Sequence, residues 1–421
     1  MKKVSLYLIL LVVVSCGSSR DVKNNKTTLN TYKDQVNRIH PEFLIFHLND
    51  TISELNFKIN SNELLYTRPD GINFLSNTII SYLLLPSYDS KEVIDSASVR
   101  LVDENNVNSD RLLFGKIKIK AKEMRNYYLR ITVADLNRGT NVTQVLFVEK
   151  DNVLNKQNFI AQSTSTNIPL FNNIIKKLES IKIIYKEKRS APLFVRYYSR
   201  EFPMAAPAFS ITEATPFQYK PDSIFTIQLD TNGVLNFTAT KTGFYHFQLD
   251  TAKRYGLTLY NFSEEFPEIK KIEDMIAPLR YITSNDEYNE LLTSTNKKEA
   301  FEKFWLTHIG SRERVKESIR KYYNRVQDAN IYYSSYIEGW KTDRGMIYLL
   351  FGTPNVIYRT ASTEAWLYGE ENSINTLRFL FTKVNNPFTD NDYSLERSQS
   401  YKQPWYIAVD AWRQGKTYLQ N

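Results

Sequence analysis

Cysteine is almost absent from this 421-residue sequence, in which Cys16 is the single example. One cysteine excludes an internal disulfide and a metal site built on several thiolates. Histidine is nearly as rare: the four are His40, His47, His246 and His308, with no HxH or HExxH spacing. The sequence therefore predicts neither a bound metal nor any other cofactor.

Catalytic signatures are also missing. The sequence has no GxSxG element, no phosphate-binding loop and no dinucleotide fingerprint. The carboxylates closest to the most distinctive part of the chain are Glu338, Asp343, Glu370 and Glu371. A glycosidase needs two carboxyls at a defined separation across a cleft, and this spacing indicates no such pair. We therefore expect a protein that is not an enzyme.

Neither sign of charge dominates. The chain has 54 Lys and Arg against 46 Asp and Glu, a formal net charge of +8. The basic residues are scattered without a compact cluster, so nucleic acid is not an expected partner. A weak attraction to anionic lipid or glycan stays open.

Long apolar runs are missing except at the N-terminus. Lys2 and Lys3 precede the apolar residues 4–14, and the sequence Val13-Val14-Ser15-Cys16 follows the pattern of a lipobox. A transmembrane anchor is the alternative, but it needs roughly twenty apolar residues. We expect residues 1–15 to be a lipoprotein signal peptide. Cys16 then carries the acyl chains, such as palmitate, that attach the protein to a membrane.

The central part of the sequence is typical of strands. Residues 16–40 are polar and predict a lipidated tether. Over 41–150 apolar residues alternate with polar ones, as at Leu55, Phe57 and Ile59, and the spacing predicts a β-sandwich-like domain. Residues 151–266 predict a second β-rich domain, in which strands over 223–229 and 234–238 flank Asn232-Gly233 as a hairpin.

Helices with capping signals are predicted after residue 267. Ser284 with Glu287, and Asn296 with Glu299, have the spacing of capping boxes. Later residues return to β patterns over 356–358, 365–368 and 377–381. The predicted fold class is mainly β with an α+β C-terminal domain over 267–421. In it, a helical layer packs on a small antiparallel meander.

Three glycines and a proline lie close together in one segment of this last domain. It reads Gly339-Trp340-Lys341-Thr342-Asp343-Arg344-Gly345 and continues to Gly352 and Pro354. The apolar residues 346–351 fit a buried strand or a helix. Thr342 followed by Asp343 favours a helix start, and Gly352 with Pro354 favours its end, so we predict a helix.

The same segment carries a family resemblance. The chain resembles the GWxTD-domain proteins of Bacteroidota, a lipoprotein-rich family whose biochemical role is largely undefined. The resemblance covers roughly residues 265–421 and rests on the motif and on residues before and after it: Pro278-Leu279-Arg280-Tyr281-Ile282, Phe304-Trp305, Arg325-Val326, Ala329-Asn330, Phe351-Gly352-Thr353-Pro354 and Glu364-Ala365-Trp366-Leu367-Tyr368. It implies no catalytic residues.

Two further comparisons concern fold and location. Phe351-Gly352-Thr353-Pro354, followed by Trp366-Leu367-Tyr368 and Leu377-Arg378-Phe379, is similar to the small lipoprotein subunit of the β-barrel assembly machinery, as an analogy of fold. Surface-exported lipoproteins of this phylum resemble one another in an acidic run after the cysteine. Residues 17–21 lack that run, which favours the periplasmic face of the outer membrane.

Two groups of residues are candidates for recognition. Asp343 and Arg344 form either a ligand-binding pair or, as we favour, a turn fixed by bonds to the local backbone. The aromatic residues form either an interaction surface or a core belt: Tyr332, Tyr333, Tyr336, Trp340, Trp366 and Tyr368. We expect a non-enzymatic scaffold or accessory subunit of an envelope complex with an outer-membrane or periplasmic protein partner. The alternative is a protein that binds or processes envelope glycans in an aromatic-lined cleft.

Overall fold

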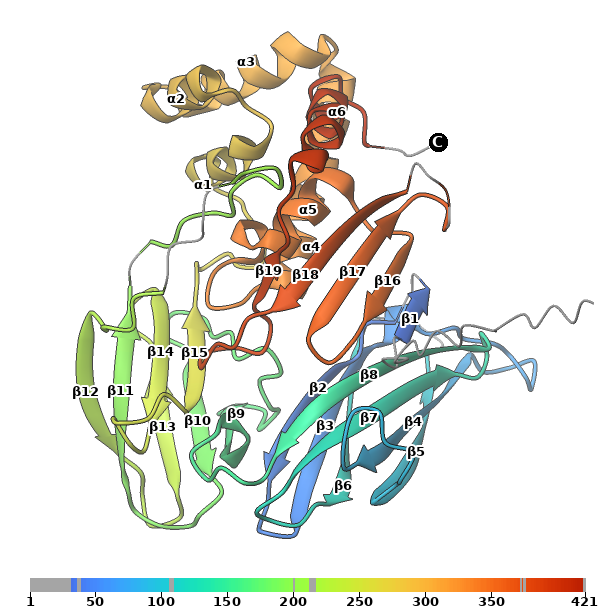
Figure 1. Ribbon diagram of the computed structural model, residues 1–421, viewed down its shortest axis with the longest axis vertical. Helices are drawn as coiled ribbons and strands as arrows, with labels where there is room; N and C mark the ends of the chain where they lie inside the picture. The colour runs from blue at the N-terminus through green and yellow to red at the C-terminus, as the bar shows by residue number, and fades with distance from the viewer. Residues whose placement is uncertain are drawn as a thin grey trace, which may run out of the picture.

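The computed structural model describes residues 32–35, 39–105, 110–199, 201–211, 217–371, 373 and 376–418. The predicted signal peptide and Cys16 lie outside these residues. Two β-sandwiches stand side by side, and a helical and β unit sits above them (Figure 1). This arrangement confirms the predicted class, mainly β with an α+β C-terminal part. No helix within the described ranges is long and apolar enough to cross a membrane.

The first sandwich packs a sheet of order β2-β3-β6 against one of order β5-β4-β7-β8. Its core includes Leu55, Phe57 and Ile59, the alternating residues that predicted a strand. Ile39, assigned to the tether in the sequence, is buried in the same core. The strands are β2 (Glu42–His47), β3 (Ile52–Asn60), β4 (Leu75–Leu85), β5 (Asp95–Glu104), β6 (Leu112–Lys120), β7 (Asn126–Asp135) and β8 (Thr140–Glu149).

The second sandwich packs a sheet of order β13-β10-β9 against one of order β12-β11-β14-β15. Both inner faces are apolar, and they share one core with Leu193, Val195 and Phe237 among its residues. The strands are β9 (Phe159–Ser163), β10 (Ser180–Tyr185), β11 (Pro192–Tyr198), β12 (Ser223–Gln228), β13 (Val234–Thr238), β14 (Gly243–Gln248) and β15 (Leu257–Asn261).

The predicted hairpin over 223–238 is wrong in its pairing. Both strands and the turn exist, and Gly233 has the positive φ of 71° that favoured a turn there. However, β12 pairs with β11 while β13 pairs with β10 in the opposite sheet. A turn sequence fixes a reversal of the chain, but the residues that β12 and β13 contact decide the sheet that each strand joins.

The C-terminal unit packs helices on a sheet of order β1-β16-β17-β18-β19. The predicted meander is confirmed as β16 to β18, and the predicted helix over 346–351 is confirmed as part of α5. The helices are α1 (Ile272–Ile276), α2 (Asn285–Thr293), α3 (Lys297–Ile309), α4 (Arg312–Tyr333), α5 (Asp343–Phe351) and α6 (Lys402–Arg413). The strands are β1 (Tyr32–Gln35), β16 (Val356–Arg359), β17 (Thr363–Tyr368), β18 (Leu377–Lys383) and β19 (Tyr393–Leu395).

Helix capping follows the sequence signals closely. At α2 both bonds of the capping box are present between Ser284 and Glu287. At α3 the side chain of Asn296 accepts from the Glu299 N–H, but Glu299 bonds the Asn296 side chain instead of its backbone. The helix α6 was not predicted, and β1 corrects the tether: residues 32–35 pair antiparallel with β16.

A segment of the second sandwich crosses into the C-terminal unit. We call residues 201–211 the strap (Figure 1, green beside α1). The Ala205 N–H donates to the Lys341 carbonyl at 2.8 Å, and the Ser398 N–H donates to the Ala208 carbonyl at 3.1 Å. Ala208 is fully buried in the helical core. The strap therefore completes the packing of a unit that begins more than fifty residues later.

An aromatic cluster joins the same two units. Phe388, from the loop between β18 and β19, packs among Tyr198, Phe244 and Tyr260 of the second sandwich. The centroid of the Phe388 ring lies 4.9 Å from that of Phe244. Aromatic pairs at this separation add to the free energy of burial, so the cluster holds the two units together.

Candidate functional site

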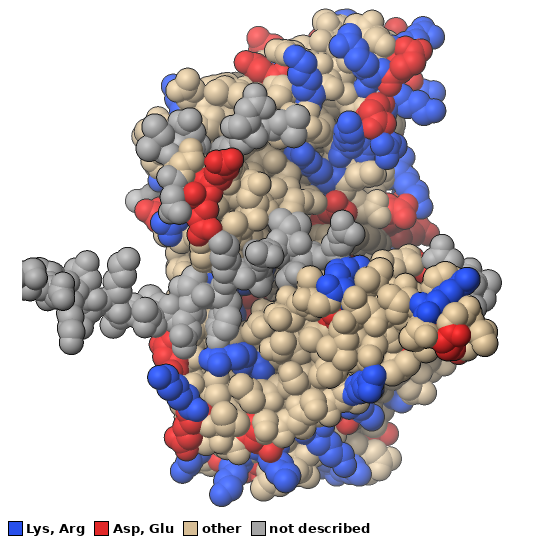
Figure 2. Space-filling model, turned by 90° about the vertical axis from the view of Figure 1, so that its right-hand side faces the viewer, with Lys and Arg blue, Asp and Glu red and all other residues tan. Residues whose placement is uncertain are grey.

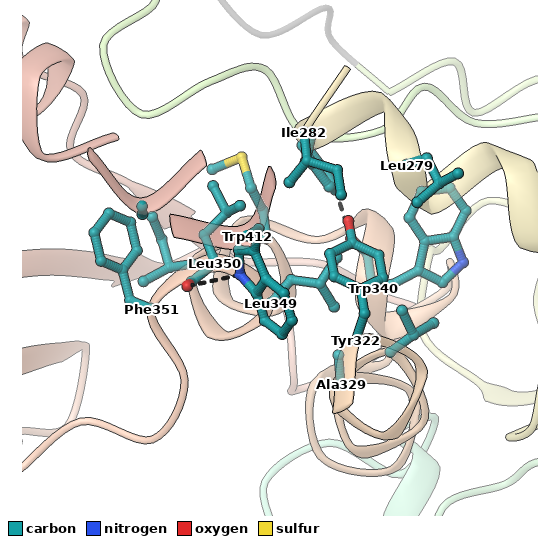
Figure 3. Packing of buried hydrophobic residues seen from close by; sticks show 14 of the residues in the cluster. Leu279, Ile282, Tyr322, Ala329, Trp340, Leu349, Leu350, Phe351 and Trp412 are labelled. Carbon is teal, nitrogen blue, oxygen red and sulfur yellow. Dashed lines mark hydrogen bonds between the residues drawn. The ribbon is translucent and has the colours of Figure 1, made fainter. Parts of the chain in front are cut away.

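The tryptophan of the GWKTDRG segment lies in the helical core. Trp340 is 6% exposed, and its ring lies beside Leu279 in Figure 3. The backbone N–H of Trp340 donates to the Asn330 side-chain oxygen at 3.3 Å. The Tyr281 hydroxyl donates to the Trp340 backbone carbonyl at 3.3 Å. Two residues from outside the segment thus fix its backbone, and Trp340 offers no surface for a ligand.

Two glycines of the segment allow α4 and α5 to approach closely. A Cβ added to Gly339 would lie 1.8 Å from the Ala329 carbonyl oxygen of α4. One added to Gly345 would lie 1.8 Å from the Gly339 carbonyl oxygen. Backbone atoms at these positions leave no room for any side chain, so both glycines are required by packing.

Thr342 begins helix α5 as predicted. Its hydroxyl accepts from the Gly345 N–H at 3.1 Å and donates to the Gly339 carbonyl at 2.8 Å. At the other end Gly352 has a φ of 81°, and Pro354 is buried just beyond it. The Arg325 side chain donates to carbonyls of the last turn, those of Leu349 and Leu350. Both ends of the helix are therefore closed by hydrogen bonds.

Asp343 does not fix its own turn, which corrects the preferred interpretation of the sequence. Its Oδ2 atom accepts from the Leu395 N–H at 2.7 Å, and its Oδ1 atom accepts from the Arg397 guanidinium at 2.5 Å. Arg397 also donates to the Ala206 carbonyl of the strap. Asp343 therefore links α5, the segment after β18 and the strap.

Arg344 points to a different set of partners. Its Nη1 atom lies 3.3 Å from Glu364 Oε1, and its Nη2 atom donates to the Asn391 carbonyl at 3.0 Å. The guanidinium also stacks over the Tyr393 ring at 4.0 Å. Because Arg344 and Asp343 engage separate partners, they do not form a joint ligand-binding pair.

Glu364 is the buried anion of this arrangement. Its side chain is 7% exposed, and the Trp366 indole N–H donates to its Oε2 atom at 3.1 Å. Burial alone would raise the pKa of Glu364, but the Arg344 and Arg359 charges outweigh it and hold the pKa below its usual range. The carboxylate is thus ionised and fully engaged, without access for a substrate.

Most of the candidate aromatic residues form a core belt, one of the two interpretations that the sequence left open. Trp366 and Tyr368 are buried because β17 lies against α5, and the Tyr368 hydroxyl donates to the Gly352 carbonyl. Tyr333 packs against Trp366 with a centroid distance of 5.2 Å, and Tyr336 joins the Phe388 cluster. Only Tyr332 among the six is exposed, and its ring lies 4.9 Å from that of His40.

The candidate carboxylates do not converge. Asp343 and Glu364 are engaged inside the unit, Glu338 pairs with Lys341, and Glu370 and Glu371 are exposed beyond β17. No group of His, Cys, Asp or Glu within the described residues has the arrangement of a metal site. Figure 2 shows acidic and basic side chains next to one another over the helical end, without a patch of one sign on that face.

A polar cluster joins α2, α3 and α6. Both Nη atoms of the Arg413 guanidinium donate to the Glu287 carboxylate, each at 2.7 Å. His308 Nδ1 lies 2.7 Å from the Phe304 carbonyl oxygen, and its Nε2 faces Arg413. A cavity of about 150 Å³ adjoins this cluster, smaller than typical ligand pockets of roughly 300 Å³ or more. The cluster therefore acts as a tie between α2, α3 and α6.

This tie predicts a pH dependence of stability. Hydrogen bonds from Arg413 lower the pKa of Glu287 to about 2, against about 4.5 in the unfolded chain. A lowered pKa stabilises the fold above pH 4.5, and this contribution is lost as the pH falls towards 2. We expect Arg413→Gln to reduce the loss of unfolding free energy between pH 5 and pH 2.5, measured by urea titration. An unchanged pH slope in the variant would contradict the assignment to Glu287.

The two most exposed large apolar side chains among the described residues of this unit lie on α6. Trp405, Ala408 and Trp412 face the core, while Tyr406 and Ile407 on the outer face are 50% and 51% exposed. An open depression of about 550 Å³ runs along this face, lined by Gln399, Ser400, Lys402, Gln403, Tyr406, Ile407 and Asp410. The helical spacing of the apolar residues Trp405, Ala408 and Trp412 is the signal that could have identified α6 in the sequence.

Comparison with known proteins supports one assignment. No curated protein matches the chain. A family model described as the GWxTD domain matches residues 243–414, from β14 to the end of α6. The motif that gives this family its name lies in the matched part as Gly339-Trp340-Lys341-Thr342-Asp343. Residues 243–414 of the chain therefore form a GWxTD domain.

Proposed function

We propose that this protein is a non-enzymatic accessory subunit or scaffold of a cell-envelope complex. In this proposal Cys16 carries the lipid that attaches it to the periplasmic face of the outer membrane. The tandem sandwiches and the GWxTD domain then present a binding surface to an outer-membrane or periplasmic protein. The lipobox pattern of residues 13–16 and the short apolar run before it support the anchor.

The observation that carries the binding role is the contrast between the motif and helix α6. The charged and aromatic residues of the motif are engaged in contacts inside the fold. Tyr406 and Ile407 instead expose apolar surface beside the open depression. Protein interfaces are enriched in tyrosine and in apolar residues at their centres, so the α6 face has the composition of a partner site.

The alternative function, recognition of a glycan, needs aromatic rings and carboxylates that face a cleft. Trp340, Trp366 and Tyr368 are buried in the core instead. The feature of the sequence that favoured this alternative is thus explained by packing.

A crosslinking experiment in native membranes tests the proposed function. We expect the wild-type chain to capture a partner in stoichiometric amount. Ile407→Lys, and separately Tyr406→Ala, should reduce this capture at least about tenfold, the effect of losing 1.4 kcal/mol of binding free energy. The matched control is Leu292→Lys, which changes an exposed leucine (46%) at the end of α2.

Two outcomes would count against the proposal. If the wild type captures no stoichiometric protein but is retained on polysaccharide or peptidoglycan, glycan binding replaces it. If Ile407→Lys and Leu292→Lys reduce capture equally, the binding surface lies away from α6.

A further inference from the structure

Strand β12 has an unpaired edge. It is the outer strand of the sheet β12-β11-β14-β15, at the left margin of the second sandwich in Figure 1. Among the described residues no strand pairs with its other edge. Five of its six residues are exposed, so neither face of the strand is well covered. The N–H and C=O groups of such an edge are a template for another extended chain.

The edge also lacks the usual protection against pairing. Proteins commonly place lysine, proline or a bulge on exposed edge strands. The edge strand β6 of the first sandwich follows this rule, with Lys116, Lys118 and Lys120 exposed along it. The sequence of β12, Ser-Ile-Phe-Thr-Ile-Gln, has no charge and no proline. The difference between the two edges indicates that β12 is suited to pairing.

Phe225 indicates what such pairing would cover. In the ladder with β11, Phe225 is opposite Val195 and Ile227 is opposite Leu193, so Phe225 shares the face that forms the core. Val195 and Leu193 are fully buried, whereas Phe225 is 38% exposed. The opposite sheet has one strand fewer and ends at β13, which leaves this edge of the core open. An additional strand beside β12 would extend the core over Phe225.

We propose that β12 pairs antiparallel with β12 of a second copy of this chain, about a twofold axis at Phe225. In this register Phe225 faces Phe225, and Ile224, 55% exposed on the other face, faces Thr226. The charges at the strand ends select the register. An axis at Phe225 places Lys220 opposite Asp230 at both ends, which is a pair of opposite charges. An axis at Thr226 would instead place Asp222 opposite Asp230, which is a pair of like charges.

The chemistry of the strand also favours a second copy over an unrelated partner. A twofold interface requires one surface to be complementary to itself. An uncharged strand with a phenylalanine on one face and an isoleucine on the other meets this requirement without burying a charge. The paired sheets would form one continuous sheet of eight strands from two four-stranded sheets.

The association state of the purified chain tests the proposal. The chain would carry Cys16→Ser, which removes the single native thiol. We expect a concentration-dependent dimer in sedimentation velocity. Phe225→Lys should weaken the dimer at least about tenfold, because two ammonium groups would meet at the axis. The control is Ile72→Lys, at an exposed position of the first sandwich (74%).

Disulfide trapping then tests the register. In the Cys16→Ser background, Phe225→Cys should form a disulfide-linked dimer under mild oxidation, since directly opposite residues have Cβ atoms about 4.5–5.5 Å apart. Ile72→Cys should not. If Phe225→Lys fails to fold, as judged by its circular dichroism, Ile224→Lys on the outer face replaces it.

Two results would overturn the proposal. One is a chain that stays monomeric at about 100 μM, well above the micromolar dissociation constants of weak specific interfaces. The other is trapping of Phe225→Cys no faster than of Ile72→Cys. A monomer whose β12 variants lose a defined envelope partner would assign the edge to strand addition by another protein.

Discussion

Replacing Gly345 with alanine should destabilise the protein by about 3 kcal/mol or more. The added Cβ would lie 1.8 Å from the Gly339 carbonyl oxygen and 2.7 Å from its carbonyl carbon. These are backbone atoms of a turn that cannot move freely, because Asn330 and Tyr281 bond Trp340 next to it. Helix α5 cannot move away from Gly339 either, since nearly all of its residues are buried.

Chemical unfolding of the two proteins measures this loss. The matched control is Gly310→Ala, at a glycine with a φ of 76° and no atom within 4 Å of the added Cβ. Its cost should be only that of a left-handed conformation, about 1–2 kcal/mol. If Gly345→Ala costs no more than Gly310→Ala, close packing is not the reason for the glycine in the motif.

Replacing Arg344 with methionine should cost about 3–5 kcal/mol, the range for a buried ion pair that loses one partner. Glu364 would remain in the core with Arg359 as its remaining cation, at 3.2 Å. The Asn391 carbonyl would also lose a donor, and the Tyr393 ring would lose its stacked guanidinium.

A double-mutant cycle with Glu364→Gln separates the ion pair from these other losses. The double variant should be more stable than the sum of the two single losses predicts, because the unpaired charge has been removed. Arg320→Met is the control, since Arg320 forms an exposed pair with Glu317 and should cost less than about 1 kcal/mol. Strict additivity of the two single losses would rule out direct coupling of Arg344 and Glu364.

The parts of the fold that follow from local chemistry were predictable. Alternating apolar residues identified the strands, because burial on one face imposes a period of two. Ser284 with Glu287 identified the start of α2, and Thr342 identified the start of α5, because a capping side chain bonds a backbone N–H within three residues. Gly352 identified its end through positive φ.

The partners of the motif were not predictable, because they lie far from it in the sequence. Asp343 bonds Leu395, and Arg344 bonds Asn391, at separations of 52 and 47 residues. Sequence spacing constrains contacts only within a turn or two, so a nearby backbone partner for Asp343 was the natural but wrong expectation. The same limit applies to β12 and β13, whose turn is local but whose sheets are chosen by distant residues.

The strap and the Phe388 cluster have a consequence for how this domain can be inherited. The part of the chain that matches the family begins at residue 243, inside a sheet two of whose strands, β11 and β12, precede it. Its helical core contains Ala208, and Phe388 lies against Tyr198, both outside the matched residues. The matched segment is therefore smaller than the segment that buries its core. Recombination of this chain at residue 243 would have to preserve both the strap and β11.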